Sequence, residues 1–362
     1  MILCSLGLFI NNGVDLSQWR ILGVLQYFGV SNFVVAATVL LTRHFTRREM
    51  IQHYTAGKSS LSDVTPLGTS DPLLPRAKVG DEETLFAEPI TPAETTFVSS
   101  FLYQLRVSSV FLCYRYEWII QVSILVLSLA INFGWAAPGC PLGYFGAGGI
   151  SEDGEYQSCT GGIHRHIDLI MVGSKHFYQG PTCKQLYDCI SYDPEGILGM
   201  LTAINLTYLG LMSGRVLLHF RTTFQRLLHW LGASLVLLLI AGCLCGFSQN
   251  DGIIPVNNNL WSTSFGVLLA GGALFMLSWI YVLVDAWNWW SGVPFLYLGM
   301  NSILIYVGSE LLGDHFPFDV TIDGTDDDYR THAELLTANS IGVISWMLVA
   351  YFCYRNKFFL KI

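Results

Sequence analysis

Long apolar runs alternate with polar stretches along most of the chain. Seven of these runs reach the length of about 20 residues that a helix needs to cross a bilayer. The pattern therefore predicts an all-α fold, a polytopic transmembrane helix bundle. The predicted spans lie near residues 21–42, 116–135, 196–214, 227–247, 262–284, 294–312 and 336–354.

The first ten residues, "MILCSLGLFI", form one further apolar run that is too short to cross a bilayer. They lack the basic start and the cleavage-site pattern of a signal peptide. We interpret them as the remnant of an additional span, so the chain is expected to start inside a membrane domain.

Composition supports a membrane protein. Of the 362 residues, 52% are hydrophobic and only 13% are charged, about half the charged fraction of soluble domains. The mean hydropathy is +0.46. The net charge of −8, without a basic stripe, argues against nucleic acid as a partner. The sequence also lacks a P-loop, a dinucleotide fingerprint and a zinc-protease motif.

The distribution of lysine and arginine predicts the orientation. One side of the predicted bundle carries 14 of the 19 basic residues, in loop 43–115, loop 215–226, the turn near 285–293 and the C-terminus. Because cytoplasmic loops are enriched in Lys and Arg, this side is expected to be cytosolic. The C-terminus is then cytosolic, and loop 136–195 faces the lumen or the exterior.

These observations predict three parts. Residues 1–42 hold the partial span, a short lumenal turn and the first full span. Residues 43–115, rich in Ser, Thr, Pro and mixed charge, are expected to form a flexible cytosolic loop. Residues 116–362 form a six-span membrane domain that includes the lumenal loop 136–195.

Polar residues within spans or at span ends are the candidates for function, since such residues are costly in a membrane. Four stretches of the sequence carry them. The substrate and cavity candidates are Arg20, Gln26, Asp193, Glu195, Asn257, Asn259, Trp261, Asn301, Ser302 and Tyr306.

Each stretch also has a purely structural interpretation. In "SYDPEGILGM", Asp193 is a candidate N-cap, Pro194 the first helical residue and Glu195 a first-turn charge. Arg20 is alternatively an interfacial anchor, and Trp261 part of the aromatic belt.

Asn301 and Ser302 are alternatively interhelical hydrogen-bonding residues. His164 and His166 have the spacing of metal ligands but lack an obvious third ligand, so no metal site is predicted.

Six motifs occur in one order: "GVLQYFGVSNFVVA", "PGCPLGYFGAGGI", "CTGG", "YDPEGILG", "GIIPVNNNLWS" and "GMNSILIYVG". On these motifs the chain closely resembles the heparan-alpha-glucosaminide N-acetyltransferase family. The resemblance extends from about residue 19 to residue 362, except for the cytosolic loop.

The resemblance implies a lysosomal multi-pass enzyme. It implies that an acetyl group passes from cytosolic acetyl-CoA to the terminal glucosamine of heparan sulfate in the lumen. Acetyl-CoA is then a co-substrate, and membrane lipid and a heparan sulfate oligosaccharide are partners, without a metal. The amine must be uncharged to attack the thioester, so a general base is expected.

The resemblance places the catalytic His in a segment that precedes the motifs. None of the nine histidines lies in a matching motif, so no catalytic residue is assigned and the activity of this chain alone is left open. Four positions depart from the family pattern. They are Leu22 in place of Pro, Tyr27 in place of Arg, Asn258 in place of Lys and Ser309 in place of His.

The resemblance also makes Asp193 and Glu195 candidates for a lumenal site that orients the amine or organises the cavity. The lumenal cysteines are disulfide candidates, because disulfides persist on that side. Cys183 and Cys189 are expected to pair across a short loop. Cys140 and Cys159 pair either with each other or with a cysteine outside this chain.

Two alternatives remain open at this point. One is a transporter without chemistry, which interrupted helices would favour. The other is a non-catalytic assembly subunit, and a homo-oligomer is compatible with either.

Overall fold

A computed structural model describes most of the chain. The described residues are 2–10, 12, 15–62, 114–248, 252–313, 315–320 and 331–360, and for residues 47 and 49–62 the description is limited to the backbone. Within these ranges the chain is helical and contains no β-strand, which confirms the predicted all-α class.

Six helices in the described ranges are long and apolar enough to cross a membrane. Each of them overlaps one of the predicted spans. They are α2 (Val24–Ser62, apolar as far as Thr46), α4 (Arg115–Gly134), α7 (Ile197–His219), α8 (Thr223–Leu244), α9 (Thr263–Tyr281, continued through a π-helical turn, η6, Val282–Ala286) and α12 (His332–Arg355).

Seven spans were predicted, and the described ranges contain six helices of membrane length, because the predicted span 294–312 is not one continuous helix. It forms two short helices, α10 (Phe295–Met300) and α11 (Ser302–Leu312), which meet at Asn301. Asn301 has non-helical backbone angles, and its side chain bonds the backbone near the C-terminus. Its Nδ2 donates to the Phe358 oxygen at 2.9 Å, and its Oδ1 accepts from the Leu360 N–H at 3.0 Å.

The apolar part of α2 ends at Thr46, close to the predicted end of the first span at residue 42, but the helix itself extends further. The helix α2 continues to Ser62, because residues 43–56 contain neither Pro nor Gly to end it. Residues 63–113 lie outside the described ranges, so the predicted flexible loop is untested there. Most of the acidic loop 319–330 lies outside them as well.

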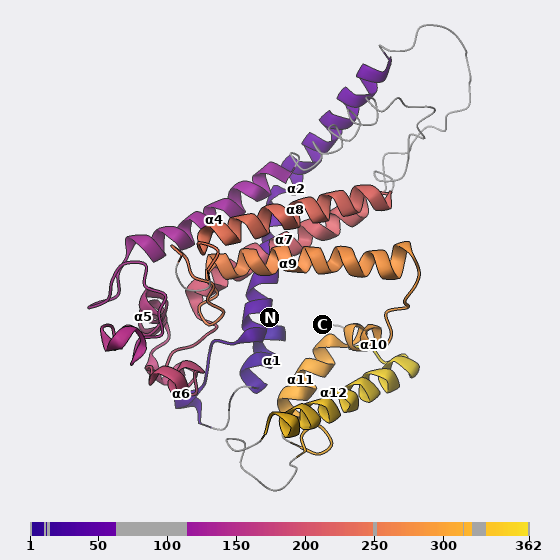
Figure 1. Cartoon of the computed structure of the whole chain (residues 1–362). Coiled ribbons are helices and arrows are strands. Elements are labelled where there is room, and N and C mark those ends of the chain that lie inside the picture. The colour runs from indigo at the N-terminus through magenta and orange to yellow at the C-terminus, as the bar shows by residue number, and fades with distance from the viewer. Residues whose placement is uncertain are drawn as a thin grey trace.

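The spans form two groups in space (Figure 1). In the first group α8 packs along α9, and the helices α2, α4 and α7 pack against one another. In the second group α10 and α11 lie beside α12. The short N-terminal helix α1 (Ile2–Ile10) packs on α2 and also touches α11. It therefore links the two groups.

The helix α4 buries polar residues and exposes apolar ones. Its buried residues are Glu117, Gln121, Ser128 and Asn132. Its exposed face includes Ile119, Val122, Val126 and Leu127. An apolar outer face suits contact with lipid, so the interior between α2, α4 and α7 is the polar side of this helix.

The segment between α4 and α7 folds into a helical cap. Its helices are η4 (Ser151–Gly154), α5 (Gly162–Met171), η5 (Ser174–His176) and α6 (Cys183–Tyr187); a further 3₁₀ turn, η1 (Leu16–Gln18), precedes α2. The structure pairs Cys140 with Cys159 and Cys183 with Cys189. Phe145, Tyr192, Ile254 and Leu260 pack around the second disulfide, so the cap also contacts the turn before α9.

Candidate functional site

Arg20, which precedes α2, joins the two carboxylates that precede α7. Its Nε donates to Asp193 Oδ2 at 2.8 Å, and one terminal nitrogen donates to Asp193 Oδ1 at 2.6 Å. The same nitrogen donates to Glu195 Oε2. Arg20 thus meets, at one point, two predicted site residues that follow it by more than 170 positions. We call these three residues the Arg20 cluster.

The two carboxylates differ in access to solvent. The Asp193 side chain is completely buried, whereas the Glu195 side chain is 16% exposed and that of Arg20 18% exposed. Burial raises the pKa of Glu195, against the opposing charge of Arg20. Two carboxylates share one guanidinium, so the cluster carries an excess of negative charge and favours a cation in contact with Glu195.

Asp193 is not the N-cap of α7, contrary to the capping interpretation. The N-cap is Gly196, and the Ile197 N–H donates to Asp168 Oδ1 of α5 at 2.8 Å. Asp193 Oδ1 instead accepts from the Glu195 N–H at 3.2 Å and from Arg20. Asp168, from the helical segment between α4 and α7, therefore accepts the hydrogen bond at the start of α7. Both carboxylates of the motif remain available to bind Arg20.

Asp168 was not predicted from the sequence, because it lies in the segment 136–195, which was predicted to be a loop, and outside the motifs. It is 1% exposed, and burial raises its pKa to about 7, opposed by the Ile197 hydrogen bond and reinforced by Asp193. A Cβ at Gly196 would overlap the Asp168 carboxylate, so glycine permits this close approach. The position of Asp168, four residues after His164 on an amphipathic helix, was the available signal.

The helix α5 also fixes the end of α4. His164 Nε2 lies 2.9 Å from Asn132 Oδ1, and burial lowers the pKa of His164 to about 4. Its neighbour His166 packs edge-on against Trp135. In the described ranges no three His, Cys, Asp or Glu side chains are arranged to hold a metal ion.

Tyr27 and Trp261 pack against each other next to the Arg20 cluster. The Tyr27 hydroxyl donates to the Gly196 oxygen, and its ring lies 5.3 Å from that of Trp261. Gly199, the second glycine of the motif, lies against both side chains, where a Cβ would be crowded. Tyr27 therefore links α2 to the start of α7, at the position where the family pattern has Arg.

The two predicted asparagines of the turn before α9 have mainly structural contacts. Asn257 Nδ2 donates to the Phe145 oxygen at 2.9 Å, and its Oδ1 accepts from the Leu260 N–H at 3.2 Å. Asn259 Nδ2 reaches Thr182 Oγ1 at 3.4 Å at the surface. These contacts hold the turn against the cap.

The three site residues predicted at or within α11 differ in their surroundings. Asn301 bonds the backbone near the C-terminus, and Ser302 is exposed. Tyr306, in contrast, is half-buried and lies within electrostatic range of Glu195 and Arg20. Of these residues, Tyr306 is therefore the one that lies near the Arg20 cluster.

Gln26 lies in the first turn of α2 and is 6% exposed. Gly7 of α1 lies directly against its amide. In the described part of the chain neither its Nε2 nor its Oε1 has a protein hydrogen-bond partner.

A second ionic cluster was missed in the sequence. Arg215 of α7 donates to Glu117 of α4 through two nitrogens, at 2.6 and 3.1 Å. Thr42 of α2 lies 3.5 Å from the same carboxylate, and Arg215 stacks on Tyr114 at 3.8 Å. We call this the Arg215 cluster. Arg215 is 18 residues after Ile197, so the two clusters are about 27 Å apart along α7, close to the thickness of a bilayer core.

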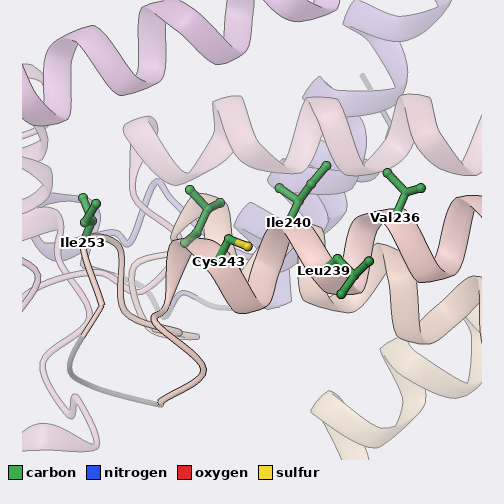
Figure 2. Close-up of a pocket in the computed structure, with 6 residues that line it drawn as sticks. Val236, Leu239, Ile240, Cys243 and Ile253 are labelled. Carbon is green, nitrogen blue, oxygen red and sulfur yellow. The ribbon is translucent and has the colours of Figure 1, made fainter.

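An apolar hollow of about 360 Å³ lies on α8 (Figure 2). Val236, Leu239, Ile240 and Cys243 line it along the helix, and Ile253 closes one end. None of its lining residues belongs to either ionic cluster, and its apolar lining is that of a surface facing lipid.

No protein-family model matches the chain. The human "Heparan-alpha-glucosaminide N-acetyltransferase" is 41% identical over 248 residues, which are 68% of this chain and 37% of that protein. The mouse protein of the same name is 40% identical over the same shares. The match thus spans less than two fifths of the relatives' length. These similarities confirm the resemblance that the motifs predict: over about two thirds of its length the chain is a relative of the heparan-alpha-glucosaminide N-acetyltransferases.

Proposed function

We propose that this chain is part of a membrane acetyltransferase. The acetyl donor is acetyl-CoA on the cytosolic side, and the acceptor is the terminal glucosamine of heparan sulfate in the lysosomal lumen. The names of the two relatives support the reaction, and the six membrane-length helices support its location in a membrane. In this orientation the Arg20 cluster is lumenal and the C-terminus cytosolic.

The observation that carries the proposal is the excess of carboxylate in the Arg20 cluster. Glucosamine in an acidic lumen is a cation, and an ammonium group binds best to a partly desolvated carboxylate. Asp193 is buried and holds Arg20, whereas Glu195 is partly exposed. We therefore assign Glu195 to contact the ammonium group and Asp193 to position Arg20.

The reaction requires the ammonium group to lose a proton before its nitrogen attacks the thioester carbon. The C–N bond then forms, the C–S bond breaks, and CoA leaves as a thiolate that takes up the second proton, which the nitrogen releases as it becomes the amide. Glu195 and Tyr306 are proposed to orient the amine, and the packed rings of Trp261 and Tyr27 lie beside Glu195. The general base is assigned to no residue of this chain.

The transporter alternative gains one observation, since the helix interruption at Asn301 is a feature of transporter binding sites. Here, however, the Asn301 side chain bonds two backbone groups near the C-terminus. Protein groups thus occupy the break that a transported ligand would use, and the acetyltransferase is the better-supported function.

A chimaera tests the proposal. The chain replaces the corresponding membrane region of the human relative, and membranes are assayed with labelled acetyl-CoA and a glucosamine glycoside. Acetyl transfer is expected, and Glu195→Gln should reduce it at least tenfold at unchanged abundance. A chimaera that folds, reaches the lysosome and shows no transfer would refute the proposal.

A further inference from the structure

Two buried glutamines lie near opposite ends of the same helix group. Gln26 of α2 is 6% exposed and Gln121 of α4 is 1% exposed. Among the described residues, neither the amide nitrogen nor the amide oxygen of either side chain has a protein hydrogen-bond partner. Four strong hydrogen-bonding atoms are therefore buried in a membrane-spanning part of the molecule without a hydrogen bond to another described protein group.

Such burial is costly. An amide without a hydrogen bond costs roughly 2–7 kcal/mol in an apolar environment, and hydrocarbon offers no substitute. Some neighbouring polar residues avoid that cost: Thr38 and Thr42 donate to backbone oxygens one turn earlier, and Asn132 does the same. Among the described residues, the buried hydroxyls of Ser31, Thr46 and Tyr208 also have no protein hydrogen-bond partner, but each is a single group, whereas each glutamine leaves both of its amide atoms without one. The two glutamines therefore need a partner that is not protein.

Each glutamine adjoins one ionic cluster. Gln121 lies one turn, about 6 Å, from Glu117 along α4. The Tyr208 hydroxyl lies in the same region, beside the pair of Glu117 and Arg215. Gln26 lies six residues after Arg20 and next to Tyr27, which contacts the start of α7.

An apolar layer separates the two glutamines. Val35 of α2 packs with Ile204, Tyr208 and Met212 of α7. Thr42 contacts Glu117, so these two residues lie at the same height along the helix axes. Gln26 is 16 residues before Thr42, which is a distance of about 24 Å along α2. Subtracting the 6 Å between Glu117 and Gln121 leaves about 18 Å between the two amides, less than the roughly 30 Å of a bilayer core.

We propose that two water-filled half-channels enter the helix group from opposite ends, one reaching Gln26 and the other Gln121. Ordered water is the hydrogen-bonding partner of both amides, as is usual for buried polar groups without protein partners. Val35 and Ile204, which lie between the levels of the two glutamines, form the barrier between the half-channels. This inference concerns access and holds whether or not the acetyltransferase proposal does.

Cysteine accessibility tests both half-channels. Gln26→Cys and Gln121→Cys are made separately in a chain whose five cysteines outside the two disulfides are replaced by alanine. A cationic, membrane-impermeant methanethiosulfonate is applied to each side of sealed vesicles in turn. Each cysteine is expected to react from its own side only, at least tenfold faster than from the other.

Val122→Cys is the matched control. Val122 is 50% exposed on the lipid-facing surface of α4, so a cysteine there should not react with the membrane-impermeant reagent. Failure of either glutamine position to react from its own side would overturn the proposal. Equal reaction from both sides would overturn the barrier.

Hydroxyl-radical footprinting of the unaltered chain provides the second measurement, which does not depend on a variant folding. Tyr208 and Trp230 are 1% and 2% exposed, so both are equally hidden from bulk solvent. Water near Gln121 predicts that Tyr208 is modified several times faster than Trp230, although tryptophan is intrinsically at least as reactive. A Tyr208 rate at or below that of Trp230 would contradict an internal water pocket.

Discussion

The two ionic clusters lie at opposite ends of the same helices, yet they are built differently. In the Arg215 cluster one carboxylate meets one guanidinium, and both belong to regular helices. In the Arg20 cluster two carboxylates meet one guanidinium, and all three residues lie in irregular segments before helices. The first pair is neutral and joins helices; the second has a surplus charge and a partly exposed carboxylate.

Because of this difference, we expect the Arg215 cluster to serve mainly the stability of the fold and the Arg20 cluster to serve mainly ligand recognition. A balanced buried pair has its charges neutralised by its own partners, so its loss mainly affects folding. A cluster with an unbalanced carboxylate costs stability unless a cation binds it. We expect mutations in the first region to lower protein level and mutations of Glu195 to change ligand binding.

The largest effect is expected from Arg215→Met. It leaves the buried Glu117 charge without its partner, which costs about 3–5 kcal/mol and should reduce the folded amount strongly. Thermal denaturation in detergent and protein level in membranes measure it. The double variant with Glu117→Leu removes both charges and should recover most of the stability; an equally unstable double variant would contradict the pairing as the cause.

Within the Arg20 cluster, Asp193→Asn should destabilise more than Glu195→Gln. Asp193 is fully buried and binds Arg20 through both oxygens, and charged hydrogen bonds of this kind contribute about 1.5–3 kcal/mol. Glu195 is less buried and binds Arg20 through one oxygen, so its ion pair should contribute less than that of Asp193. Melting temperatures of the two variants measure this order, and the reverse order would exchange their assigned roles.

Asp168 should make stability depend on pH. Its folded pKa of about 7 is above the unfolded value, so the folded state holds a proton that the unfolded state has lost. Its stabilising contribution is therefore present below about pH 4 and disappears as pH rises through 7. The lowered pKa of His164 acts in the opposite direction between pH 4 and 6.5, so the wild type alone does not isolate the effect.

The difference between wild type and Asp168→Asn isolates it. The melting temperature of the wild type relative to this variant should fall by about 2–4 °C for each kcal/mol lost between pH 5 and pH 8. A constant difference across that range would exclude Asp168 as the titrating group.

The smallest effect is expected from Tyr27→Phe. It removes one hydrogen bond to the Gly196 oxygen and keeps the ring against Trp261, so it should cost about 0.5–1.5 kcal/mol. Tyr27→Ala, which also removes the ring, should cost more. Equal melting temperatures of Tyr27→Phe and the wild type would show that the hydrogen bond adds nothing.

The features of the fold that depend on local composition were predicted from the sequence. Apolar run length located every helix of membrane length in the described ranges, because a span needs only enough apolar residues. The interruption at Asn301 was not predictable, since it depends on contacts with residues near 358–360. The continuation of α2 to Ser62 was not predicted, because the polar composition of residues 43–62 was interpreted as flexibility.

The site was predicted in its residues but not in its geometry. Arg20, Asp193 and Glu195 were candidates, yet no pattern indicated that they contact one another. The capping interpretation of Asp193 failed because Asp168, from a different segment, closes the helix instead. Glu117 and Arg215 were missed since each lies at the end of an apolar run, where charged residues are ordinary.

The most direct test of the central claim is the affinity of the unaltered chain for a glucosamine glycoside, compared with its N-acetylated form. We predict that the chain binds the ammonium-bearing glycoside. Glu195→Gln should weaken this binding at least tenfold, whereas Arg215 variants that remain folded should not weaken it. The N-acetylated form, which lacks the charge, should bind equally to the wild type and Glu195→Gln. Equal affinity of Glu195→Gln and the wild type for the charged glycoside would contradict the assignment of the Arg20 cluster as its site.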